Sequence, residues 1–133
     1  ADDYVRTFVA HTNPLNVLCG RSLMRTLDNC KRINGSVCID PGDDSWIDLA
    51  EGNTIKGVRQ GASVVDLQHW KTGQAVEGLG RGPTLVDSGI GMRDALQIRY
   101  QTGNKLVLHD NQKVVGILGD TELYHALLGK NLG

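Results

Sequence analysis

The sequence predicts an α/β fold built from two related halves, and two observations support this prediction. Residues 47–58 (IDLAEGNTIKGV) align without a gap with residues 106–117 (LVLHDNQKVVGI). Each segment has the pattern of a strand, a polar turn and a second strand, with Gly57 and Gly116 at equivalent places in the second strand. Residues 83–129 also show the order strand, helix, strand, strand, helix. We therefore expect an internal duplication in which each half contains one β-hairpin.

The second half begins with a strand and a helix. Residues 83–87 (PTLVD) form a short apolar run that predicts a strand. Residues 91–103 (GMRDALQIRYQTG) predict a helix that places Met92 and Leu96 on one face and stops at Gly103.

The second half ends with the sequence KVVGILGDTELYHALLG, residues 113–129. After a strand and a glycine-containing turn, residues 120–128 predict an amphipathic helix, because Leu123, Ala126 and Leu127 fall at positions i, i+3 and i+4. A strand, a glycine turn and a helix suit either a nucleotide cradle or a simple packing unit, and the pattern alone leaves both interpretations open.

The first half departs from this pattern. Residues 30–46 do not predict the equivalent of the 91–103 helix, because Gly35 and the Pro41-Gly42 turn interrupt them. We expect a strand over 36–40 (SVCID) followed by a loop. After the first hairpin, residues 62–70 (ASVVDLQHW) predict a helix.

The chain opens with a helical pattern in which Tyr4, Val5, Phe8 and Val9 share one stripe. This helix should end by residue 11, since Asn13 precedes Pro14 and the residue before a proline is forced out of helical geometry. A first residue other than Met and an immediate helix indicate a piece of a longer protein.

Composition argues against several functions. The chain has 133 residues, 40% of them hydrophobic, and a net charge of −1 with its 14 basic residues scattered, so we expect one soluble folded unit and no nucleic-acid partner. No apolar run approaches the roughly 20 residues needed to span a bilayer, so we expect no direct membrane insertion. The cysteines Cys19, Cys30 and Cys38 lack C-x-x-C spacing, and the histidines lack metal-ligand spacing, so no metal site is predicted. No catalytic residues are predicted either, because no nucleophile, base and orienting group stand at a recognisable spacing.

The strand-helix-strand-strand-helix unit, doubled and closed by KVVGILGDTELYHALLG, resembles the cystathionine-beta-synthase (CBS) domain, pairs of which form regulatory modules. The opening sequence ADDYVRTFVAHTNPLNVLCGRSLMR is similar to the segment that leaves the ATPase domain in ABC importers of glycine betaine, choline and proline. The resemblance implies a tandem CBS pair with pseudo-twofold symmetry. Residues 1–25 would be the linker helix region from an ATPase domain, 26–72 a degenerate first repeat and 73–133 the second repeat.

The function that the resemblance implies is regulation and dimerisation within the ATP-binding subunit of an osmoprotectant importer. Its partners would be a second copy of the chain, the parent ATPase domain and the permease subunits, at the cytoplasmic, inner face of the cell membrane. The fragment contains no Walker A sequence G-x-x-x-x-G-K-[ST], so we expect no ATP hydrolysis, and no cofactor is required. Apolar helix faces are candidates for dimer contacts or internal packing; they comprise Met92, Leu96, Leu123 and Leu127.

The alternative function is sensing of an adenine nucleotide or cyclic di-AMP. CBS domains that bind adenosine compounds resemble one another in a Gly-apolar-apolar-Thr-x-x-Asp turn, whose threonine meets phosphate and whose aspartate meets ribose. Here Gly119 and Glu122 stand at the threonine and aspartate positions of the second copy, and Gln60 and Ser63 stand at those of the first. Gly119 keeps the backbone donor but lacks the hydroxyl, and Asp120 adds a carboxylate beside any phosphate. The candidate ligand cleft comprises Val86, Asp87, Ile117, Gly119, Asp120, Glu122, Gln60 and Ser63.

Overall fold

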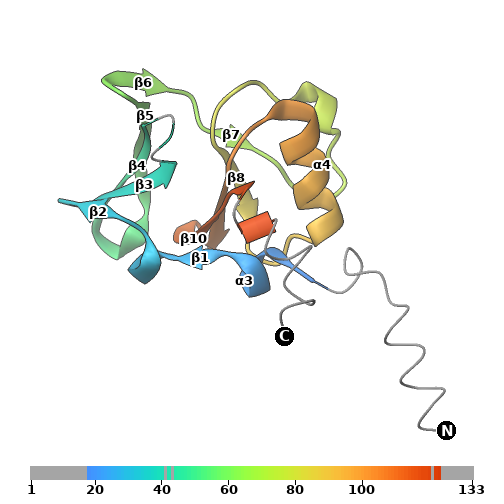
Figure 1. Cartoon of the computed structure of the whole chain (residues 1–133), viewed down its shortest axis with the longest axis horizontal. Helices are drawn as coiled ribbons and strands as arrows, with labels where there is room; N and C mark the ends of the chain where they lie inside the picture. The colour runs from blue at the N-terminus through green and yellow to red at the C-terminus, as the bar shows by residue number, and fades with distance from the viewer. Residues whose placement is uncertain (1–17, 41, 43, 121, 124–133) are drawn as a thin grey trace, which may run out of the picture.

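The computed structural model describes residues 18–40, 42, 44–120, 122 and 123. It shows a mixed α/β protein dominated by strands in two five-stranded sheets, with few helices (Figure 1). The helix predicted near the N-terminus, the candidate Leu127 and the greater part of the helix predicted over 120–128 lie outside the described residues. Asp120, Glu122 and Leu123, at the start of that last helix, are helical.

The first sheet has the strand order β1-β10-β9-β8-β7. Strand β8 is parallel to β7 and β9, whereas β10 is antiparallel to β9 and to β1. Helix α4 connects β8 to β9. The bounds are β1 Arg25–Thr26, β7 Gln68–His69, β8 Thr84–Asp87, α4 Met92–Thr102, β9 Leu106–Asp110 and β10 Lys113–Leu118. The predicted order strand, helix, strand, strand is confirmed.

Helix α4 has the face and the end that its sequence predicts. Met92, Ala95 and Ile98 are fully buried and fall on one side of the helix. Gly103 follows in left-handed geometry with φ of 76°, and its N–H donates to the carbonyl of Arg99, which satisfies one of the last free carbonyls of the helix. The buried face directs the helix against the first sheet.

The second sheet is an antiparallel meander in which each of the strands β2 to β6 pairs with the next. The bounds of its strands are β2 Arg32–Ile33, β3 Ser36–Asp40, β4 Ser45–Leu49, β5 Ile55–Gln60 and β6 Ser63–Val65. Short 3-10 turns occur elsewhere along the chain, as η1 Leu27–Asn29, η2 Glu51–Asn53 and η3 Val76–Gly78. The strand predicted over 36–40 is confirmed.

The helix predicted over residues 62–70 is wrong, because this segment contains β6 and β7 with a crossing between the two sheets. Val65 pairs with Val58 in the second sheet, whereas His69 pairs with Leu85 in the first. The apolar residues of the segment face different cores, since Leu67 packs in the cluster between the sheets and Trp70 in the cluster beneath α4. Within the described residues, the first half therefore has a meander where the second half has a strand-helix-strand unit.

Two hydrophobic clusters hold three layers together, the second sheet, the first sheet and α4 (Figure 1). Buried side chains of both sheets meet in one cluster, which includes Val37, Ile47, Val58, Leu85, Val107 and Ile117. The other cluster joins the opposite face of the first sheet to α4 and includes Val86, Ala95, Ile98, Leu106, Leu108 and Leu118. The first sheet is thus covered on both faces, which explains the nearly continuous apolar runs of β8, β9 and β10.

The end of the predicted linker region is part of the first sheet. After the short helix α3 (Gly20–Leu23), Arg25 and Thr26 pair with Ile117 and Gly116 of β10. A Cβ atom added to Gly116 would lie 2.5 Å from Met24 Sδ and 2.8 Å from the Arg25 carbonyl oxygen. The glycine of the V-G-I sequence is therefore required by the close approach of this neighbouring segment.

Candidate functional site between the two sheets

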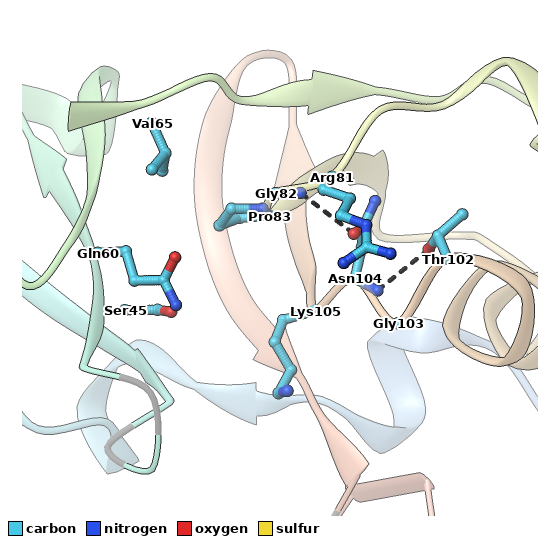
Figure 2. Close-up of a pocket in the computed structure, with 10 residues that line it drawn as sticks. All are labelled: Ser45, Gln60, Val65, Arg81, Gly82, Pro83, Thr102, Gly103, Asn104 and Lys105. Carbon is cyan, nitrogen blue, oxygen red and sulfur yellow. Dashed lines mark hydrogen bonds between the residues drawn. The ribbon is translucent and has the colours of Figure 1, made fainter. Parts of the chain in front are cut away.

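A cleft of about 360 Å³ lies where the second sheet faces the N-terminal ends of β8 and β9 (Figure 2). The residues that line it are Ser45, Gln60, Val65, Arg81, Gly82, Pro83, Thr102, Gly103, Asn104 and Lys105. The first three belong to the second sheet, Thr102 is the last residue of α4, and the others belong to the two loops that lead into β8 and β9. The cleft is therefore formed by both halves of the chain.

Asn104 holds the two loops of the cleft together. Its side chain is buried and its Oδ1 accepts a hydrogen bond of 3.1 Å from the N–H of Gly82 (Figure 2). Its Nδ2 donates to the carbonyl of Gly80 at 2.9 Å and to Thr84 Oγ1 at 3.1 Å. A buried amide with several partners fixes the loop geometry, since each partner would otherwise be left unsatisfied.

Gly82 allows the loop before β8 to pass close to the crossing segment between the sheets. Its φ is +140°, and a Cβ atom at this position would lie 2.6 Å from the carbonyl oxygen of Asp66. Both the backbone conformation and the contact exclude a larger residue without rearrangement. The shape of this wall therefore depends on glycine.

Two cationic residues line the cleft, and they differ in their partners. Lys105 Nζ lies 3.0 Å from Asp40 Oδ2, and this ion pair joins the start of β9 to the end of β3. The Arg81 side chain is exposed and makes no hydrogen bond or ion pair within the part of the chain that the structure describes. Arg81 is therefore the cation of this cleft that an anionic ligand could engage without breaking an existing pair.

The ion pair between the sheets changes the protonation of Asp40. Burial alone would raise the pKa of this carboxyl group. The backbone N–H of Gly42, at 2.8 Å, and the ammonium of Lys105 together outweigh that effect and hold the pKa below its ordinary value. Asp40 is thus stabilised as a carboxylate.

The turn after β10 is internally satisfied. The N–H of Gly119 donates to Glu122 Oε1 at 2.8 Å, which is the arrangement of a helix residue that caps its own first turn. Asp120 Oδ2 accepts from Arg99 Nη2 at 2.7 Å, and this hydrogen bond lowers the pKa of Asp120 despite partial burial. The backbone donor expected to meet a phosphate is therefore already occupied, as a packing unit requires.

The structure brings some of the predicted cleft residues together and separates others. Gln60 lines the cleft, whereas its register partner Ser63 is exposed and is not one of the lining residues. Gly119 lies at the same edge, because a Cβ atom there would be 3.9 Å from Lys105 Cδ. Asp120 and Glu122 lie near this edge too, because they follow Gly119 in the turn after β10.

Three other predicted residues lie elsewhere. Val86 and Ile117 are fully buried, in the clusters beneath α4 and between the sheets respectively. Asp87 is exposed at the opposite, carboxyl end of β8. These three residues do not line the cleft between the sheets.

The candidate dimer residues face the interior where the structure describes them. Met92 and Leu123 are buried in the protein, with exposed fractions of 0% and 3%. Leu96 is partly buried and packs against the cluster beneath α4. These side chains therefore take part in internal packing, which the sequence suggested as the alternative to dimer contact.

Sequence reasoning missed Arg81, Asn104 and Lys105. Arg81 lies in a glycine-rich loop, and Asn104 and Lys105 follow the glycine that ends α4. Only the positions of the two loops could have indicated these residues. Both loops precede parallel strands, so they meet at one edge of the sheet. The charges themselves follow no recognisable spacing.

Other features of the described residues are plain. Cys19, Cys30 and Cys38 are free, and burial raises the pKa of Cys30 and Cys38. Among residues 18–40, 42, 44–120, 122 and 123, the acidic, histidine and cysteine side chains form no group that could hold a metal ion. None of the helices described is long and apolar enough to cross a membrane.

Comparison of the chain with protein-family models, curated proteins and solved structures gives no match.

Proposed function

We propose that this chain is a regulatory module of the CBS type from the ATP-binding subunit of an importer for glycine betaine, choline or proline. The observation that carries the proposal is the order β8, α4, β9, β10, with β8 and β9 parallel and β9 and β10 antiparallel. Asp120, Glu122 and Leu123, which are helical, continue this order. It is the order expected of one CBS unit, and the sequence of the opening segment supports the importer.

The module would act through contacts between subunits at the cytoplasmic face of the membrane. An importer of this kind has two ATP-binding subunits, so two modules come close enough to associate. If those contacts differ between the open and closed transporter, a coupling of about 1–3 kcal/mol is enough to regulate transport. The partners are a second copy, the parent ATPase domain and the permease subunits.

Tyr100 is the side chain of α4 that best suits such a contact. It is 91% exposed, whereas the apolar face of the same helix is buried in the protein. Tyrosine is enriched in interfaces because it combines a large contact area with a polar end. We therefore assign the dimer contact to the outward face of α4, which carries Tyr100.

Sedimentation equilibrium tests this assignment. The chain should form a dimer, and Tyr100→Glu should weaken the dimer by at least about tenfold, because a charge would be buried against a neighbour. Val64→Glu on the second sheet is the matched control, since Val64 is also exposed, at 82%. A monomer at all concentrations, or equal effects of the two substitutions, would contradict a dimer through α4.

A second candidate function is sensing of an adenine nucleotide or cyclic di-AMP in the cleft between the sheets. It is favoured by Arg81 and Lys105, which place two cations along a cleft whose loops are fixed by Asn104. The phosphates would lie against Arg81, while Lys105 keeps its ion pair with Asp40 beside them. Gln60 would offer its amide to the base or ribose.

A thermal-shift titration with ATP, ADP, AMP, S-adenosylmethionine and cyclic di-AMP tests the second candidate. A ligand at a hundred times its dissociation constant should stabilise the chain by about 2.7 kcal/mol. Arg81→Ala and Gln60→Ala should weaken this effect, while Lys113→Ala, at the other edge of the first sheet, should not. If no compound gives a saturable shift, the cleft does not sense these nucleotides.

A further inference from the structure

A second cavity, of about 240 Å³, lies at the edge of the first sheet that is opposite to the cleft. It is formed at the carboxyl ends of the parallel strands β7, β8 and β9, which contribute His69, Asp87 and His109. Small ligands commonly bind beyond the carboxyl ends of parallel strands, because loops there converge on a shared opening. We call this cavity the edge cavity.

Strand register places the polar side chains of the edge cavity on one face of the sheet. Asp87 on β8 is the register partner of His109 on β9, and His69 on β7 is the register partner of Leu85. Leu85 and Asp87 are two residues apart on β8 and therefore share a face. Asp87 thus has His109 as its neighbour on β9, while His69 on β7 lies beside Leu85, two residues before Asp87 along β8.

Two of these groups are held in place by backbone donors. Asp87 Oδ1 accepts a hydrogen bond of 2.8 Å from the N–H of Gly89. His109 Nδ1 accepts one of 3.2 Å from the N–H of Gln112. Because Nδ1 is an acceptor, the neutral imidazole of His109 carries its hydrogen on Nε2, which can donate to a ligand.

The edge cavity contains one group of each charge. Lys71 supplies an ammonium and Asp87 a carboxylate, and neither forms an ion pair within the described part of the chain. Leu85 and Ile90, each 3% exposed, supply an apolar wall. A ligand with only a negative charge would meet Asp87, and a ligand with only a positive charge would meet Lys71.

We propose that the edge cavity binds a small zwitterion of the α-amino-acid class. The ligand ammonium binds Asp87, the ligand carboxylate binds Lys71 and the Nε2–H of His109, and the carbon skeleton packs on Leu85 and Ile90. This site uses neither the cleft between the sheets nor the outward face of α4. It therefore goes beyond the proposed function and stands or fails independently of it.

Isothermal titration of the whole chain with L-valine tests the proposal. Isobutylamine and 3-methylbutanoate have the same branched skeleton but lack the carboxylate and the ammonium respectively. L-valine should bind saturably, and each analogue should bind at least about tenfold more weakly, because each loses one charged hydrogen-bonding partner. No saturable binding of L-valine, or equal binding of one analogue, would overturn the proposal.

Three variants locate the binding. Asp87→Asn and Lys71→Met should each weaken binding of L-valine by at least about tenfold. Asp87→Asn keeps the Oδ1 acceptor for the N–H of Gly89, so the loop should keep its conformation, which circular dichroism can verify. Arg81→Ala, in the cleft between the sheets, should bind L-valine as the unchanged chain does. Unaltered binding by both edge-cavity variants would overturn the assignment of the site.

Discussion

At the scale of single residues, two equivalent glycines show that the two aligned hairpins have different neighbours. Gly57 and Gly116 occupy equivalent places in the aligned segments, yet the structure surrounds them differently. A Cβ atom at Gly116 would meet Met24 and the Arg25 backbone, whereas at Gly57 it would meet nothing within 4 Å. Neither glycine has the positive φ that would itself demand glycine. The equivalence was visible in the sequence, but the close approach of β1 was not, because its sequence separation from β10 is long.

Alanine substitution at these two glycines should separate the two roles. Gly116→Ala should destabilise the chain by about 1–3 kcal/mol, because the backbone oxygen of Arg25 can yield only by moving β1. Gly57→Ala should be neutral or stabilising by up to about 1 kcal/mol, since alanine has less backbone freedom to lose. Urea unfolding of both variants measures the difference. Equal effects would contradict the described packing of β1 on β10.

At the scale of elements, the sequence predicted helices and strands correctly where the apolar residues of a segment follow a single period. The α4 residues repeat with a helical period and end in Gly103, and the β9–β10 hairpin turns at Asn111 and Gln112, which both have positive φ. Residues 62–70 failed as a helix because their apolar residues divide between two cores. The cleft was only partly predictable, since Gln60 follows from the repeat while Arg81 depends on how two loops meet.

The strand assignment of β6 predicts the sign of a stability change. Val64 is 82% exposed on β6 and opposite Arg59, so packing contributes little and backbone preference decides. In a strand, Val64→Ala should destabilise by about 0.5 kcal/mol and Val64→Thr should be nearly neutral. In a helix, alanine would instead stabilise by a similar amount. Thermal unfolding of both variants distinguishes these cases, and a stabilised Val64→Ala would argue for the helix.

At the scale of the whole molecule, an ion pair supplements the hydrophobic cluster that joins the sheets. Asp40 ends β3 of the second sheet, Lys105 directly precedes β9 of the first sheet, and both are partly buried, with side-chain exposures of 27% and 15%. The pKa of Asp40 is lowered in the folded state, so its carboxylate stabilises the fold above the unfolded pKa of about 4. That contribution is lost as pH falls through the folded pKa.

Replacement of Asp40 should therefore have a pH-dependent cost. Asp40→Asn should lower the free energy of unfolding by about 1 kcal/mol at pH 7, a modest value because solvent screens the pair. The difference from the unchanged chain should shrink as the pH falls below about 4. Asp28→Asn, at an exposed position in η1, is the control and should have little effect. Urea unfolding at several pH values measures both, and a cost that stays constant with pH would contradict the ion-pair account.

The central proposal is that this chain is a module that regulates an importer rather than catalysing a reaction. The most direct test is ATP hydrolysis by the complete importer in proteoliposomes, with and without residues 18–133 of this chain, measured as osmolyte and nucleotide concentrations are varied. Hydrolysis should persist without the module, while its response to those conditions should change by about fivefold or more, as a coupling of 1 kcal/mol or greater requires. Identical responses of the two importers would contradict the claim.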